Sequence, residues 1–201
     1  MNLIQRFKGI FTNPDETFGE IKESPDFKGL LVSFLIVLLE CIMIAAILMS
    51  KITITDHPQF SYILFIVILI TLIIGFLLVY VVDTIIIWII GKIFKGSGSL
   101  KQTASAFGYV CIFQVIYYVG VLISALSFNP VSIKISNAIF YQQMFTILFG
   151  SLIMLIFSII LAILFTIYVY FISRYIHELN KIRAIIIVVI FIIISLVFEI
   201  F

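Results

Sequence analysis

Five polar side chains interrupt the long apolar stretches of this sequence at spacings that could bring them together. Glu40, Asp83 and Gln114 each lie about 12 to 16 Å from the expected cytoplasmic end of an apolar stretch, if that stretch is helical. Tyr80 lies three residues before Asp83, and Tyr117 lies three after Gln114, so each tyrosine shares a helical face with its polar neighbour. A cluster of these five side chains, acting as a proton or cation site, is the sharpest hypothesis for chemistry in this chain.

The cost of burying these groups limits what the cluster can be. Glu40, Asp83 and Gln114 would each be strongly unfavourable facing lipid, so we expect them to point inward or into a wet cavity. No Lys, Arg or His lies inside the apolar stretches. At least one carboxyl is therefore expected to be protonated, or the two share a proton or a bound cation. The alternative, which is the commoner use of such groups, is a hydrogen-bonded lock between helices worth about 1 kcal/mol per bond.

The elements that must position these residues are membrane helices. The chain has 201 residues, of which 64% are hydrophobic and only 11% are charged. Its mean hydropathy is +1.33. A soluble domain is about half apolar and about a quarter charged, so the bilayer must act as the solvent for this protein. The net charge of +2 does not favour nucleic acid as a partner.

Five stretches have the length of about 20 apolar residues that a spanning helix needs. They are roughly residues 29–50, 61–91, 103–126, 143–173 and 184–201. The sequence therefore predicts an all-α integral membrane protein, a five-helix transmembrane bundle over residues 29–201, preceded by short cytoplasmic interfacial helices in residues 1–28.

Positive charge gives the expected orientation. Ten of the twelve Lys and Arg residues fall in the N-terminal segment, in residues 92–102 and in residues 174–183, while Lys51 and Lys134 fall in the other two connections. Because cytoplasmic segments carry the excess of Lys and Arg, we expect a cytoplasmic N-terminus and an outside C-terminus in the cell membrane.

The segment before the first span carries helix-start signals. Asn13, Pro14 and Glu16 read as Ncap, N1 and N3 of a short helix, with Asn13 capping the free amides and Glu16 nearly completing a capping box. Phe18 and Ile21 would share one face of that helix.

A second start signal, Ser24-Pro25, precedes the first span. Earlier apolar residues at helical spacing suit a second helix lying in the membrane interface. They are Leu3, Ile4, Phe7, Ile10 and Phe11. These helices act either as a plain anchor, which is the commoner case, or as a docking surface for a partner.

Small residues predict close helix packing in the third span. Ala104 and Gly108 lie four residues apart near its start, and Gly120 and Ser124 near its end. Such pairs let another helix approach closely. The sequence leaves open whether that helix belongs to the same chain or to a second copy in a homo-oligomer.

The motifs expected of enzymes and cofactor sites are missing from the sequence. GKIFKGSGS, residues 91–99, lacks the order of a phosphate-binding loop, and no HExxH or paired-Cys motif occurs. Cys41 and Cys111 lie in apolar stretches and read as small buried hydrophobes. His177 and Glu178 are expected on a solvated loop face. We therefore expect a non-enzymatic protein without cofactor or metal.

Two stretches resemble the YIP-domain family of Ypt/Rab-interacting multispan membrane proteins in its compact prokaryotic form. IQRFKGIFTNPDETFGEIKESPDF, residues 4–27, has a basic amphipathic start, an N-P-x-E-T-F-like element and a second Pro. GSGSLKQTASAFGYV, residues 96–110, has a Gly-rich turn and then a helix with the pair Gly108-Tyr109. Family members often carry a Pro soon after this pair, but GYVCIFQVIYY has none.

The resemblance covers essentially the whole chain and implies five spans with a cytoplasmic N-terminus. Eukaryotic members look like membrane adaptors for prenylated Rab-type GTPases, and we do not carry that binding over to this chain. The leading expectation is a membrane scaffold or adaptor that contacts lipid and an unknown membrane or cytoplasmic protein. The alternative is a small proton, cation or solute transporter that uses the intramembrane carboxyls.

Overall fold

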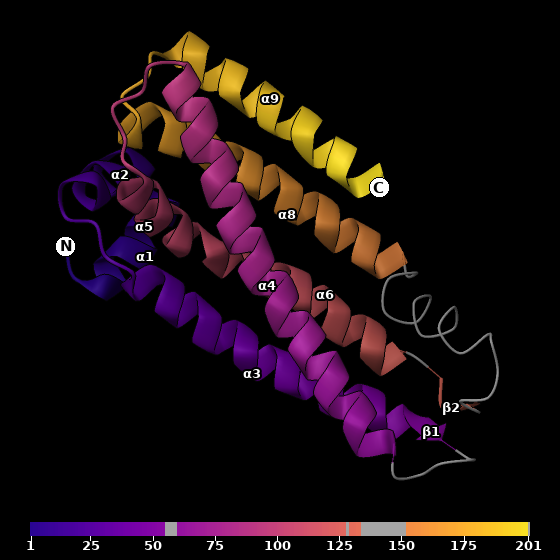
Figure 1. Cartoon of the computed structure of the whole chain (residues 1–201). Helices are drawn as coiled ribbons and strands as arrows, with labels where there is room; N and C mark the ends of the chain where they lie inside the picture. Colours follow the sequence, from indigo (N-terminus) through magenta and orange to yellow (C-terminus); the bar gives the residue numbers. More distant parts are fainter. Residues whose placement is uncertain (55–59, 128, 134–151, 201) are drawn as a thin grey trace. The chain divides into compact units, whose positions relative to one another are not determined.

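Figure 1 shows the computed structural model of the chain. It describes residues 1–54, 60–127, 129–133 and 152–200. In chain order the elements are α1 (Leu3–Thr12), α2 (Pro14–Glu23), α3 (Lys28–Lys51), β1 (Ile52–Ile54), α4 (Phe60–Ile93), α5 (Leu100–Val110), the 3₁₀ turn η1 (Cys111–Phe113), α6 (Gln114–Ser127), β2 (Val131–Ile133), α8 (Leu152–Phe171), the π-helical turn η2 (Ile172–Ile176) and α9 (Lys181–Ile200).

Four helical stretches of the described chain have the length and apolar composition of a membrane-spanning helix. They are Lys28–Lys51, Phe60–Ile93, Leu100–Ser127 and Leu152–Ile176. These match the first four expected spans, although residues 143–151, the expected start of the fourth, lie outside the described residues. Helix α9 overlaps the expected fifth span but is not among the four, so the fifth span stays a prediction.

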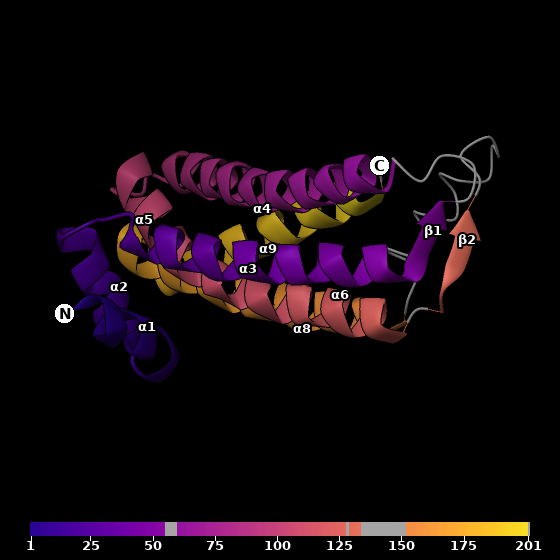
Figure 2. The same cartoon turned by 90° about the horizontal axis from the view of Figure 1, so that it is seen from below.

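Two features differ from the expected pattern of uninterrupted helices and loops. The third expected span is broken by η1 although the sequence has no proline there. Strands β1 and β2 pair in parallel, with Ile52 opposite Val131, and lie side by side in Figures 1 and 2. Both strands consist mainly of β-branched residues, which favour extended backbone even in short connections.

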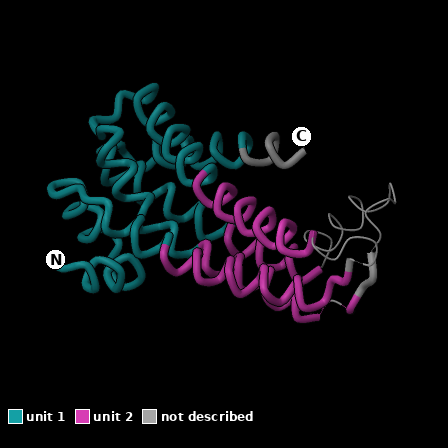
Figure 3. Tube along the Cα trace, turned by 60° about the horizontal axis from the view of Figure 1, so that its bottom comes forward, with its two compact units in different colours: residues 1–34, 78–113, 162–201 teal, residues 35–77, 114–161 magenta. Residues whose placement is uncertain are grey.

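The chain divides into two compact units, which Figure 3 shows in different colours. Unit 1 consists of residues 1–34, 78–113 and 162–201, and unit 2 of residues 35–77 and 114–161.

The core of unit 1 is rich in aromatic rings. Phe18 of α2 stacks on Phe171 with ring centroids 6.3 Å apart, and Phe113 stacks on Tyr168 at 4.6 Å. Phe107 of α5 meets Phe165 of α8 edge-on at 5.4 Å. Because these rings come from segments far apart in the sequence, they join α2, α5, η1 and α8 into one core.

The helix ends of unit 1 are capped, but not always by the expected residues. Asn2 forms a complete capping box with Gln5 at the start of α1, and Ser99 forms one with Gln102 at the start of α5. These four side chains satisfy backbone amides that the helix leaves free.

Two expected caps are wrong in detail. Helix α2 does begin at Pro14, but Asn13 makes no side-chain capping bond and donates instead to the Glu16 carboxylate at 2.6 Å. Helix α3 begins at Lys28, whose amide donates to Asp26 Oδ1 at 3.0 Å. Ser24 is the C-cap of α2, so the Ser24-Pro25 pair ends one helix and does not cap the next.

Candidate functional site

The five polar residues expected in one intramembrane cluster are divided between the two units. Asp83 and Tyr80 belong to unit 1, and Glu40, Gln114 and Tyr117 belong to unit 2. The Tyr80 hydroxyl donates to the Ala104 carbonyl at 3.1 Å, so its proton is not given to Asp83. The structure therefore supports Tyr80 as a link between helices and does not test the five-residue site as a whole.

In unit 2, two polar oxygens of the expected cluster are buried. Gln114 is only 4% exposed, and its Oε1 has no hydrogen-bond partner among the described residues. The same holds for Glu40 Oε2. The ring of Tyr117 lies edge-on to that of Tyr118, with centroids 5.6 Å apart. A buried oxygen without a partner costs free energy, so these two groups are the part of the hypothesis that the described structure leaves open.

The small residues of the third span lie against helices of the same chain. A Cβ atom on Gly108 would lie 2.9 Å from Leu30 Cβ, and Ser33 donates to the Gly108 carbonyl at 3.2 Å. A Cβ on Gly120 would lie 2.6 Å from Phe157 Cγ. Ala104, in the same row as Gly108, receives the Tyr80 hydroxyl, and Ser124 is half-buried.

The polar end of unit 1, which we define as residues 1–28, 92–102 and 174–183, is held together by charge. At its centre Arg6 is only 5% exposed. Its guanidinium binds Glu20 at 2.9 Å and Asp26 at 3.1 Å, and also the side-chain and main-chain oxygens of Ser24. It lies over the ring of Tyr109, 5.9 Å from the centroid. One side chain thus joins α1, α2, the start of α3 and α5.

The acids around Arg6 keep it charged. Burial opposes the charged form of Arg6, but the hydrogen bond to Glu20 and the charge of Asp26 raise its pKa above the ordinary value. The pKa of Glu20 is lowered: burial would raise it, but Arg6 and the N-terminal ammonium bind the carboxylate. A buried arginine that is paired in this way fixes geometry, because losing either partner leaves a charge uncompensated.

A second junction surrounds His177, which is only 1% exposed and does not lie on a solvated face as expected. Its ring lies against three glycines, Gly91 near the end of α4 and Gly96 and Gly98 in the α4–α5 connection. A Cβ on Gly91 would lie 2.5 Å from the imidazole, and one on Gly98 would lie 2.9 Å from Nδ1. Gly96 would meet His177 Cβ at 2.7 Å. The glycines are required here because they leave room for the ring.

Hydrogen bonds complete this junction. His177 Nε2 lies 3.1 Å from Thr103 Oγ1, and the Ser97 amide donates to the His177 carbonyl at 3.0 Å. His177 Nδ1 is buried without a partner among the described residues. Burial, with the charges of Lys92 and Lys22, lowers the pKa of His177 to about 4, so the ring is neutral near pH 7.

The two loops at this junction adopt unusual backbone. Lys95, in the α4–α5 connection, has φ 63°, and Glu178, which follows His177, has φ 56°. Left-handed backbone is unfavourable for residues other than glycine, so the surrounding contacts must hold it in place. One such contact is Ser97 Oγ donating to Glu178 at 2.5 Å, and another is the ion pair of Lys22 with Glu178.

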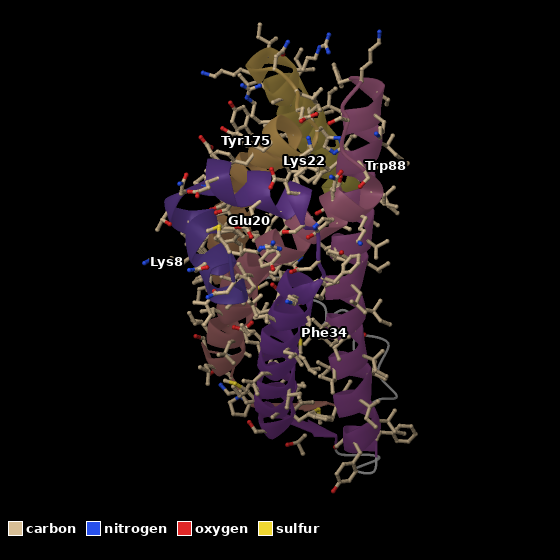
Figure 4. The ribbon with its side chains drawn as sticks, turned by 90° about the vertical axis from the view of Figure 1, so that its left-hand side faces the viewer. Lys8, Glu20, Lys22, Phe34, Trp88 and Tyr175 are labelled. Atoms are coloured by element: carbon tan, nitrogen blue, oxygen red, sulfur yellow. The ribbon has the colours of Figure 1, made fainter. Side chains whose placement is uncertain are left out.

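An open groove of about 680 Å³ lies beside this junction. It is lined by Gly19, Lys22, Glu23, Gln102, Arg174, Tyr175 and Glu178. Figure 4 shows Lys22 of α2 near Tyr175 of η2. Gln102 fixes the groove from α5, because its side-chain amide donates to the Lys22 carbonyl at 2.8 Å. The groove presents both signs of charge on a framework of hydrogen bonds.

The expected interfacial face of α2 is wrong. Phe18 and Ile21 are both fully buried in unit 1 and contact neither lipid nor a partner. Sequence reasoning also missed Arg6, Tyr109 and His177 as structural centres. No local sequence signal marks them, because the groups that bury and pair these side chains lie far away in the sequence.

The chemistry available at the polar end of unit 1 is binding. No group of three or more His, Cys, Asp or Glu that could hold a metal occurs in the described part of the chain. Its exposed groups include Glu23 and Lys101, and the buried Arg6 and His177 hold its elements together. A structured, charged surface with a groove suits recognition of another molecule.

Comparison with known protein families identifies the family to which the chain belongs. The family model of the Yip1 domain matches residues 8–200, nearly the whole sequence. No curated protein and no solved structure matches. The match agrees with the multispan helical architecture described above. The chain belongs to the Yip1 domain family, whose members are non-enzymatic multi-pass membrane proteins of a family linked to vesicle trafficking.

Proposed function

We propose that this protein is a membrane scaffold or adaptor that recruits other membrane components through the polar end of unit 1. The proposal includes a five-span bundle of the compact prokaryotic type in the cell membrane. It also includes a cytoplasmic N-terminus and an outside C-terminus. The partner is a membrane or cytoplasmic protein that contacts the groove between α2, α5 and η2.

One observation carries this proposal. The three segments that hold ten of the twelve Lys and Arg residues are joined to one another by specific bonds. Gln102 binds α2, Lys22 binds Glu178, and the Ser97 amide donates to the His177 carbonyl. Segments that merely solvated the ends of spans would not need such bonds. A preorganised surface lowers the entropy cost of binding a partner.

Photocrosslinking in the native membrane tests the recruiting surface. A photoreactive residue at Glu23, which is exposed and lines the groove, should capture one recurring protein. The matched control is Ile85 on α4, which is exposed but apolar and is expected to capture lipid. Reversing a groove charge with Lys22→Glu should reduce the capture several-fold. Only lipid or self-adducts at position 23 would overturn the adaptor proposal.

Cysteine labelling tests the orientation separately. In a background without Cys41 and Cys111, a cysteine placed at the exposed Lys95 should resist a membrane-impermeant reagent in intact cells. It should react after the cells are opened. Labelling of intact cells would place the polar end of unit 1 outside and contradict the cytoplasmic surface.

A transporter remains the second candidate, because Glu40 Oε2 and Gln114 Oε1 are buried without partners in the described structure. Proteoliposomes containing the wild-type protein should show no proton or cation flux if the adaptor proposal holds. A flux that disappears in the double variant Glu40→Gln with Asp83→Asn would favour transport instead.

A further inference from the structure

The residues of helix α1 lie on three faces: one is buried, one is exposed and polar, and one is exposed and apolar. Arg6, Gly9 and Ile10 are buried, and Gln5 and Thr12 lie on an exposed polar face. On the remaining edge are Ile4, which is 78% exposed, and Phe11, which is 61% exposed. Residues seven apart lie on one face of an α-helix, so these two share an apolar edge on which the half-buried Phe7 lies between them.

The buried face prevents α1 from rolling to hide this edge. The Arg6 guanidinium is fixed by Glu20 and Asp26, and the Tyr168 hydroxyl donates to the Ile10 carbonyl at 3.1 Å. Gly9 is also tightly packed, since a Cβ there would overlap the side chain of Thr17. The rotation of α1 about its axis is therefore set by unit 1 itself.

The apolar edge lies on the side of α1 that meets the membrane spans. Phe11 lies edge-on to Phe113, with ring centroids 5.0 Å apart, and Phe113 belongs to the candidate span Leu100–Ser127. At the start of α3, Phe27 is 50% exposed and Leu31 is 58% exposed. The same unit thus presents exposed apolar residues on both α1 and the first turn of a span.

We propose that α1 lies in the interface of one membrane leaflet, with Ile4 and Phe11 against acyl chains. Lys8 points away from the ribbon in Figure 4. In this placement the exposed Lys8, and Lys28 at the start of α3, would bind the phosphates of lipid headgroups. The occupant is lipid because this edge adjoins a span of a multi-pass membrane protein. Helix α2 does not share this role, since Phe18 is buried.

Spin labelling of the full-length protein in phospholipid nanodiscs tests this placement. Labels are attached to single cysteines at positions 4 and 11, and to matched control positions 5 and 12, in a background without Cys41 and Cys111. Labels at 4 and 11 should collide several-fold more often with oxygen than with a water-soluble nickel complex. Labels at 5 and 12 should show the opposite preference. All four positions are exposed, and because a label at position 5 also removes the capping bond of Gln5 to Asn2, each labelled protein must keep the wild-type unfolding midpoint.

Two results would overturn the proposal. Equal access of the nickel complex to all four positions would place α1 in water. Poor access of both oxygen and nickel to positions 4 and 11, in nanodiscs that hold a single copy, would mean that protein of the same chain covers the edge. Neither result depends on whether a partner binds the groove, so this proposal and the adaptor proposal can fail separately.

Discussion

Unit 1 and unit 2 are both built from apolar helices, but different interactions hold them together. In the described chain, ion pairs join Arg6 to Glu20 and Asp26 in unit 1, and aromatic rings fill its core. In unit 2, Gly120 admits Phe157 to close contact, and the Tyr118 hydroxyl donates to the Leu72 carbonyl at 3.0 Å.

The difference shows that two parts of one membrane protein can be stabilised by different kinds of interaction. Close packing at small residues suits helices that have only lipid around them, because it needs no charged groups. Buried ion pairs are costly, so we infer that those of unit 1 are kept because they hold its polar surface in one geometry. We therefore expect the stability of unit 1 to depend strongly on its buried ion pairs and hydrogen bonds.

The largest loss of stability is expected from replacing Arg6, which lies at the centre of the ion pairs of unit 1. Arg6→Ala should destabilise unit 1 by about 3 kcal/mol, because Glu20 and Asp26 lose their buried partner. Thermal unfolding in detergent measures the loss, and limited proteolysis should show cleavage in α1 and α2. The control Lys8→Ala, at an exposed position, should change little. Equal effects of the two variants would contradict the proposed importance of Arg6.

Acid should weaken unit 1 through His177. Its pKa is about 4 in the folded protein and 6.5 ordinarily, so the unfolded chain binds more protons between these values. Stability should therefore fall as the pH falls from about 6.5 to about 4. Unfolding midpoints measured between pH 7 and pH 5 check this. The variant His177→Gln should flatten the profile, and an unchanged slope would exclude His177 as its cause.

Glycine contacts should matter in both units wherever the space is closed. Gly91→Ala in unit 1 should cost about 1 to 3 kcal/mol, because the new methyl group meets the His177 ring. Gly120→Ala in unit 2 should cost a similar amount or less, since the Phe157 ring can shift. Gly75→Ala is the control: nothing lies within 4 Å, and alanine favours the helix. Denaturation in detergent compares the three variants, and an equal cost at Gly75 would refute the contact argument.

The smallest effects should come from two matched tyrosine hydroxyls. Tyr168→Phe in unit 1 and Tyr118→Phe in unit 2 each remove one hydrogen bond to a backbone carbonyl. We expect each to lose about 0.5 to 1 kcal/mol. A much larger loss of stability in Tyr168→Phe, seen as faster hydrogen exchange in α1, would show that unit 1 depends more on its polar hydrogen bonds. A larger loss of stability in Tyr118→Phe would mean that unit 2 depends more on its polar hydrogen bonds than unit 1 does.

The broad architecture could be read from the sequence because bilayer thickness and hydropathy restrict it so strongly. Helix α2 and the first four spans follow directly from Pro14 and from the apolar run lengths. The interruption at η1 was not predicted, since its three residues include no proline or glycine. The orientation and the fifth span stay predictions.

The polar junctions could not be read from the sequence because their partners lie far apart in it. Arg6 has the same local pattern whether it faces water or Tyr109, and only the fold brings α5 beneath it. Phe18 read as an exposed interfacial residue because amphipathic helices look alike whether they bury their apolar face in lipid or in protein. Tertiary packing decided between the two.

The hydrogen bond from Tyr168 to Ile10 joins residues 158 positions apart, which bears on how the protein is made. Ribosomes add about 5 to 20 residues per second, so α1 emerges about 10 to 30 seconds before its partner on α8. During that interval Ile10 and Phe18 must be shielded by lipid or a chaperone. A chain that stalls before residue 168 should therefore be removed by quality-control proteases, whichever of its spans have already inserted.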